Sequence, residues 1–123
     1  MELVPQDIRE QLMENGRAQQ PVKGTEDERD YYPVVKLFNP VGAATWLITE
    51  MDPDEPDILF GLCDLGMGFP QLGSVRLSEL QNVRNALGLG IERDVMFTAT
   101  HPLSAYARAA REAGSIVTNL PCD

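Results

Sequence analysis

The chain has 123 residues, 43% of them hydrophobic, which suits one domain with a buried core. Nineteen acidic against ten basic residues give a formal net charge of −9. This charge argues against direct nucleic-acid binding, because contact with a phosphate backbone needs a basic patch. We expect a single domain over 1–123, with an edge helix over 1–16, an acidic linker over 17–30 and an α+β core over 31–120.

Membrane and export signals are not expected. No apolar run approaches 18 residues, and the N-terminal segment MELVPQDIRE becomes polar within three residues. Cys63 and Cys122 are the two cysteines, with no CxxC motif, and are interpreted as free thiols in a reducing compartment. The composition therefore favours a cytoplasmic protein with no membrane partner and no cofactor.

The first predicted element is a helix from Val4 to Asn15. Asn15-Gly16 is a good left-handed exit for a helix. The apolar stripe of this helix is narrow and consists of Leu3, Ile8 and Leu12. We therefore expect a helix at the edge of the fold, followed by an aperiodic loop or mobile connector from Arg17 to Asp30.

The centre of the predicted sheet is a β-hairpin over about 43–65. An extended segment, Tyr31 to Phe38, precedes it and is expected to pair with its first arm. The arms flank a turn bracketed by Pro53 and Pro56, which cannot donate to a strand ladder. The predicted class is α+β, a small antiparallel sheet on this central hairpin with two or three packed helices.

Both faces of the predicted hairpin are apolar. The expected register places Met51 opposite Ile58, Leu47 opposite Leu62, and Trp46 opposite Cys63. One face then carries Leu47, Met51, Ile58, Phe60 and Leu62, and the other carries Trp46, Ile48, Leu59 and Cys63. Because a sheet with one wet face alternates apolar and polar residues, helices or loops should cover both sides of this one.

The second half of the chain predicts five further elements after a loop at 66–70. Gly73 to Leu77 is a short strand. Ser78 begins a helix, with Gln81 completing a capping box and Gly88 ending it. Val95 to Ala99 is a strand. Pro102 begins a last helix with an inner face of Leu103, Tyr106, Ala107 and Ala110, an outer face of Arg108 and Arg111, and an exit at Gly114. Ser115 to Leu120 is a final short strand.

From Leu37 to about Gly114 the chain resembles a known family. The residues that carry the resemblance are LFNPVGAATWLITEMDPDEPDILFGLCDLGMGFPQLGSVRLSEL and GLGIERDVMFTATHPLSAYARAA. They are similar to small bacterial proteins of unknown function, often encoded on conjugative plasmids, integrative elements and phages beside anti-restriction genes. The resemblance implies a bacterial cytoplasm, a mobile genetic element and interference with host defence.

The acidic turn is the candidate binding site. Its carboxylates belong to Glu50, Asp52, Asp54, Glu55 and Asp57. One interpretation is a solubilising hairpin tip, and a second is a surface that docks on a basic protein groove or imitates a nucleic-acid strand, with help from Glu26, Asp27, Glu28 and Asp30. A third is a metal loop, which lacks the central Gly and the distant Glu of an EF-hand.

Two other groups are weaker candidates for chemistry. Asp64 ends a core strand, where it is expected to accept from the loop amides of Gly66 and Met67. His101 is the one histidine and has no nearby ligand partner in the sequence. Cys63 is expected to be buried and inert.

Three functions remain open on these patterns. The first is a non-enzymatic acidic binding protein of a mobile element, such as an anti-restriction or anti-CRISPR inhibitor. The second is a small hydrolase or metal-dependent enzyme that uses Asp64, Glu50 and His101. The third is a dimeric structural domain, and the chain is accordingly expected to be a monomer or a homodimer.

Overall fold

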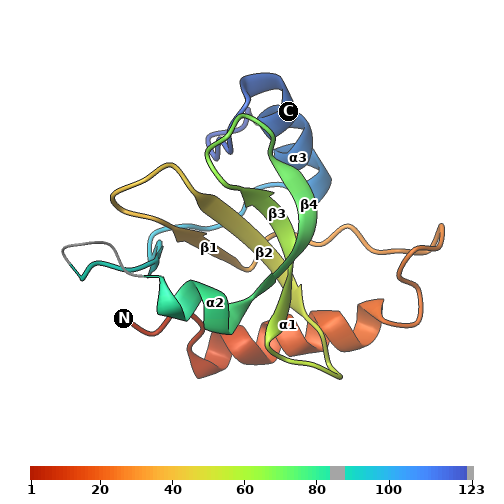
Figure 1. Cartoon of the computed structure of the whole chain (residues 1–123). Helices are drawn as coiled ribbons and strands as arrows, with labels where there is room; N and C mark the ends of the chain where they lie inside the picture. Colours follow the sequence, from red (N-terminus) through yellow and green to blue (C-terminus); the bar gives the residue numbers. More distant parts are fainter. Residues whose placement is uncertain (84–87, 122–123) are drawn as a thin grey trace.

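The chain forms a five-stranded antiparallel sheet in the order β4-β3-β2-β1-β5, in a computed structural model that describes residues 1–83 and 88–121 (Figure 1). The strands are β1 (Val35–Phe38), β2 (Thr45–Met51), β3 (Ile58–Asp64), β4 (Gln71–Arg76) and β5 (Glu92–Arg93). The helices are α1 (Gln6–Gln19), α2 (Leu77–Asn82) and α3 (Leu103–Ala113). The predicted α+β class, with its central hairpin, is confirmed.

The hairpin of β2 and β3 has the predicted register over its first half. Leu47 pairs with Leu62 and Trp46 pairs with Cys63. The expected meander is also present, because β1 pairs antiparallel with β2. The β-branched and aromatic residues of these strands suit a pleated surface that is packed on both sides.

A bulge between Ile48 and Glu50 changes the second half of the register. Met51 therefore lies opposite Leu59, and the predicted pairing of Met51 with Ile58 is wrong. Because side chains alternate between faces, one extra residue in the strand transfers Met51 to the opposite face of the sheet. The same bulge turns Glu50 toward the face that carries Phe60.

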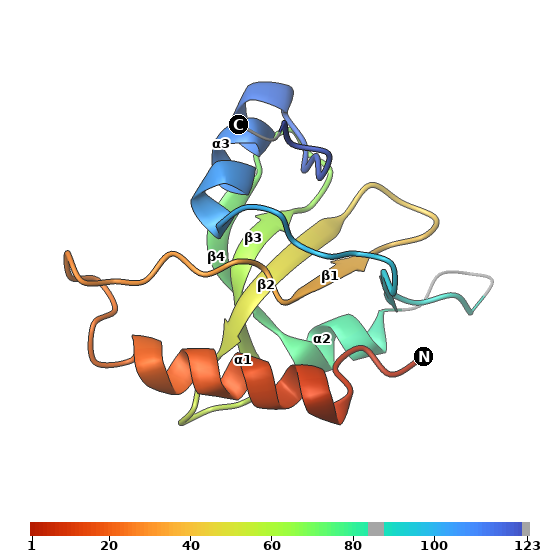
Figure 2. The same ribbon diagram turned by 180° about the vertical axis from the view of Figure 1, so that it is seen from behind.

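Two hydrophobic clusters cover the two faces of the sheet, as the apolar hairpin predicted. The cluster beneath α1 and α2 contains Leu12, Val35, Leu37, Trp46, Ile48, Met51, Leu59, Leu77 and Leu80. The cluster beneath α3 contains Leu47, Leu62, Leu103, Tyr106, Ala107 and Ala110. Figures 1 and 2 show α1 and α2 together at one end of the molecule and α3 at the other.

Helix α1 is longer and more central than predicted. It continues past the expected exit to Gln19, with Leu12 fully buried. Gly16 lies inside the helix, and glycine is required there because a Cβ would stand 1.9 Å from the carbonyl oxygen of Met51. The Nδ2 of Asn15 donates to the carbonyl oxygen of Thr49 at 2.9 Å. The prediction of an edge helix ending at Asn15 is therefore wrong, since this end packs directly on β2.

Two predicted strands are absent from the second half. The fifth strand is Glu92–Arg93, which pairs with β1, and not Val95 to Ala99. Asp94 ends the pairing because its carbonyl accepts from the amide of Phe97 and its side chain from the amide of Met96. Residues 115–120 form no strand either; Ile116 and Leu120 pack beneath α3 instead.

The helices predicted to begin at Ser78 and Pro102 agree with the structure to different extents. Helix α3 has the predicted inner face, outward arginines and left-handed exit, with φ of 79° at Gly114. Helix α2 begins at Leu77, so Ser78 is its second residue and does not form the predicted capping box. The predicted continuation toward Gly88 stops early, because Val83 is extended and ends α2; residues 84–87, like Cys122, lie outside the described residues.

Candidate functional site

The carboxylate of Asp52 stabilises the turn between β2 and β3 by accepting hydrogen bonds from its amides. Oδ1 of Asp52 accepts from the amides of Asp54 at 2.9 Å and Glu55 at 3.3 Å. This is the Asx-turn geometry that favours aspartate at the start of a tight turn. The carboxylate of Asp52 is therefore engaged within the turn itself.

Asp57 is the N-terminal cap of α2. Its Oδ1 accepts from the amide of Ser78 at 2.9 Å and its Oδ2 from the hydroxyl of Ser78 at 2.7 Å. Its carbonyl accepts from the amide of Leu77. These bonds with Ser78, and next the nearby Arg76 guanidinium, lower the pKa of the Asp57 carboxyl.

Asp30 performs the same task for α3. Its carboxylate accepts from the amide of Ser104 at 3.0 Å and from the hydroxyl of the same residue. In both helices the capping residue is far away in the chain, whereas a usual N-cap directly precedes its helix. Two acids of the candidate acidic surface thus hold helix termini.

Asp54 and Glu55 are the exposed carboxylates of the turn. Oδ2 of Asp54 accepts from Nε2 of Gln20 at 2.6 Å. Glu55 forms an ion pair with Arg76 at 3.3 Å, in which both side chains are about half exposed. Such exposed pairs contribute only ~0–1 kcal/mol, so Arg76 holds the Glu55 carboxylate only weakly.

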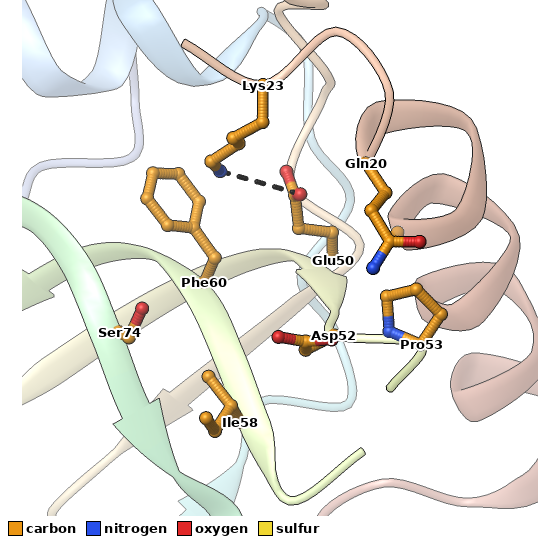
Figure 3. A pocket seen from close by; sticks show the side chains of 9 residues that line it. Gln20, Lys23, Glu50, Asp52, Pro53, Ile58, Phe60 and Ser74 are labelled. Atoms are coloured by element: carbon orange, nitrogen blue, oxygen red, sulfur yellow. Dashed lines mark ion pairs between the residues drawn. The ribbon is translucent and has the colours of Figure 1, made fainter. Parts of the chain in front are cut away.

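Glu50 is buried, with 7% of its surface exposed. Nζ of Lys23 lies 3.5 Å from Oε2 of Glu50 and 3.2 Å from the centroid of the Phe60 ring. Figure 3 shows this ammonium group between the carboxylate and the aromatic face. Burial raises the pKa of the Glu50 carboxyl, and the charge of Lys23 and a weak bond from Gln19 partly offset that effect.

A pocket of about 170 Å³ opens beside this ion pair. Its lining includes Gln20, Lys23, Glu50, Asp52, Phe60 and Ser74, which Figure 3 shows on the strand ends, the end of α1 and the loop after it. Carboxylates and an aromatic face around one ammonium group constitute a site for a cation. Lys23 lies 27 positions before Glu50, and no sequence pattern linked the two residues.

The residues of the enzyme hypothesis have separate partners. Asp64 is almost fully buried and accepts from the amides of Gly66 at 2.8 Å and Ile116 at 2.9 Å. His101 contacts Oγ1 of Thr100 at 2.7 Å and the carbonyl of Pro121 at 2.9 Å. The turn role predicted for Asp64 is confirmed at Gly66, and its second bond, to the C-terminal segment, was not foreseen.

Within residues 1–83 and 88–121, no three His, Cys, Asp or Glu side chains are grouped so that they could hold a metal ion. Over the same part of the chain, no helix combines the length and the apolar character that crossing a bilayer requires.

An apolar surface was missed by the sequence interpretation. The turn between β3 and β4 exposes 59% of Leu65, 69% of Met67 and 76% of Phe69. These side chains surround a hollow of about 360 Å³ that reaches Leu72 and Gly73 on β4. A sequence signal was available, because residues 65–75 contain no charge in a chain with 24% charged residues.

A model of a family described as "Protein of unknown function (DUF2958)" matches residues 3–117. No curated protein and no solved structure matches the chain.

Proposed function

The chain belongs to the DUF2958 family of proteins of unknown function, and we propose that it is a non-enzymatic binding protein that docks on a basic protein surface. The docking surface is the acidic hairpin end, defined by Glu50, Asp52, Asp54, Glu55 and Asp57. One observation carries the proposal: an ammonium group already lies between a buried carboxylate and an aromatic ring at this end of the molecule. A carboxylate beside an aromatic ring suits the side chains of lysine and arginine.

The five carboxylates have different roles in this proposal. Asp54 and Glu55 are the exposed charges and make the first contact with the partner. Asp52 and Asp57 hold the turn and α2 in place, so their part is to position the surface. Glu50 with Phe60 forms the cation pocket, where Lys23 is 39% exposed and can move aside for a partner's lysine or arginine.

Long-range charge supports the same partner class. A net charge of −9 attracts basic proteins and raises their association rate, most strongly at low ionic strength. Proteins that bind nucleic acid carry the basic grooves that such a surface fits. Together with the resemblance to proteins of mobile elements, this favours a restriction or CRISPR component of a bacterial host as the partner, bound in the cytoplasm.

Affinity capture from a bacterial lysate with matched variants tests the proposal. Asp54→Asn/Glu55→Gln removes the two exposed charges of the turn. Glu2→Gln/Glu112→Gln removes two exposed charges elsewhere and gives the same net charge. The wild-type protein and the control should retain a basic protein that the turn variant does not retain. The affinity of the turn variant for that protein should be about tenfold lower or more.

Two results would overturn the proposal. Equal loss of the partner in both double variants would mean that net charge alone, and not this surface, attracts it. Retention of the partner by the turn variant would place the contact elsewhere on the molecule.

A further inference from the structure

The two edges of the sheet differ in their protection. Strand β5 has two residues, Glu92 and Arg93, and both are charged. Strand β4 has six residues, Gln71–Arg76, and only the last is charged. Natural edge strands are usually kept short, charged or interrupted by proline, because their outward amides and carbonyls otherwise pair with another strand. Between Gln71 and Val75, β4 has none of these protections.

Gly73 lies in the middle of this open edge without an internal reason to be glycine. A Cβ at Gly73 would meet no atom within 4 Å, and its φ is not in the left-handed region. Its neighbour Gly61 is different, because a Cβ there would stand 2.0 Å from the carbonyl oxygen of Leu47. A strand glycine that its own fold does not require often marks the close approach of another backbone.

The apolar turn continues this edge into an uncharged surface. Met67 and Phe69 project from the turn, and the hollow of about 360 Å³ lies between them and Gly73. Contiguous exposed apolar groups of this kind usually mark a protein contact. Both the projecting side chains and a place to receive them therefore lie on one patch.

We propose that this patch binds a second copy of the chain, with β4 of one copy pairing antiparallel with β4 of the other. A twofold axis makes the same patch serve both partners, and antiparallel edge strands satisfy such an axis directly. Phe69 and Met67 of each copy pack against the hollow of the other.

Charge favours a second copy over a basic protein at this surface. Two chains of charge −9 repel each other over most of their surfaces, but residues 65–75 offer an approach without like charges. A basic partner gains nothing there and is drawn to the acidic hairpin end instead. Salt should therefore strengthen this self-association, because it screens the remaining repulsion.

Sedimentation equilibrium on the full chain tests the proposal, from about 1 μM to about 200 μM, the range in which modest interfaces dissociate. The wild type should shift from one to two chain masses with rising concentration. Phe69→Ser and Leu72→Lys should remain monomeric over the whole range. Met96→Ser is the matched control, since Met96 is 86% exposed away from this patch, and it should dimerise like the wild type.

Amide hydrogen exchange gives a second measurement that does not depend on a variant. Protection of the β4 amides should rise with protein concentration, while that of β5 amides stays constant. A wild type that is monomeric at every concentration overturns the proposal, and so does a dimer that survives both variants. Neither result affects the lysate experiment, which depends on Asp54 and Glu55.

Discussion

The two turns at the ends of β3 differ in how the fold uses their side chains. The β2–β3 turn is rich in acids, and Asp52 and Asp57 accept hydrogen bonds from its own amides and from α2. The β3–β4 turn is uncharged and exposes Met67 and Phe69 to solvent. In the first turn, charge that looked available is largely engaged; in the second, apolar groups that resemble core residues have no cover.

Side-chain type alone therefore does not identify a free surface. A carboxylate near unpaired backbone amides is drawn into hydrogen bonds with them, because an unsatisfied helix N-terminus is costly. An apolar side chain on a short turn has no such internal partner once the sheet faces are filled. The side chains that remain exposed are therefore partly acidic at one end of β3 and apolar at the other.

The largest difference in stability is expected between substitutions at Gly61, which packs against β2, and at its cross-strand partner Gly73 on the edge strand. Gly61→Ala should lower the free energy of unfolding by about 3 kcal/mol or more, because the new methyl overlaps the backbone of β2. Gly73→Ala should change it by less than about 1 kcal/mol, with a gain favoured by strand propensity. Urea titration at low protein concentration measures both, and equal losses would contradict the contrast.

Removal of the cap in the acidic turn should have the next largest effect. Asp57→Ala leaves the amide and hydroxyl of Ser78 without their acceptor, whereas the amide of Leu77 keeps its bond to the backbone carbonyl of residue 57, so the protein should be less stable at pH 7. The pKa of Asp57 is lowered in the fold, so its contribution is present above the ordinary value of 3.8 and is lost as pH falls through the folded value. Thermal unfolding from pH 7 to pH 3 should show wild type and variant converge at the acidic end.

Glu50, in the same hairpin, should show the opposite pH dependence. Its folded pKa is raised, so the native state binds the proton more tightly and stability falls as pH rises from 4.5 toward the folded value. Glu50→Gln should remove this slope and change stability at pH 7 by about 1 kcal/mol or less, since Lys23 can turn to water. A variant that retains the slope would assign it to another group.

The smallest effect on folding is expected in the apolar turn. Phe69→Ser should change the free energy of unfolding by no more than about 0.5 kcal/mol, because Phe69 is 76% exposed. The measurement is urea unfolding at a concentration where the chain is monomeric. A loss as large as that of a core residue would show that the ring supports the fold and is not free to bind.

Elements with strong local signals were predicted well from the sequence. The inner hairpin follows from two runs of β-branched and aromatic residues around paired prolines, and α3 from its 3.6-residue apolar period between Pro102 and Gly114. The turn role of Asp64 also followed from its position at a strand end. These features depend on residues within a few positions of one another, so they can be inferred from sequence.

Features that depend on distant contacts were not predicted. Gly16 resembled a helix exit, yet it is the place where α1 touches β2. Val95 to Ala99 had a strand pattern, but the free edge of β1 was taken by the two residues before Asp94. Only one segment can pair with the free edge of β1, and local strand propensity did not indicate which segment that would be.

The candidate sites divide in the same way. The α+β class, the excess of negative charge and the acidic turn follow from the sequence, because each is a sum over residues or a local pattern. Contacts between distant segments, in contrast, make Asp30 and Asp57 helix caps, bring Lys23 to Glu50 and Phe60, and leave β4 as an open edge. A charged or apolar side chain is free to bind another molecule only where no group of the folded chain contacts it, and those contacts come from residues far away in the sequence.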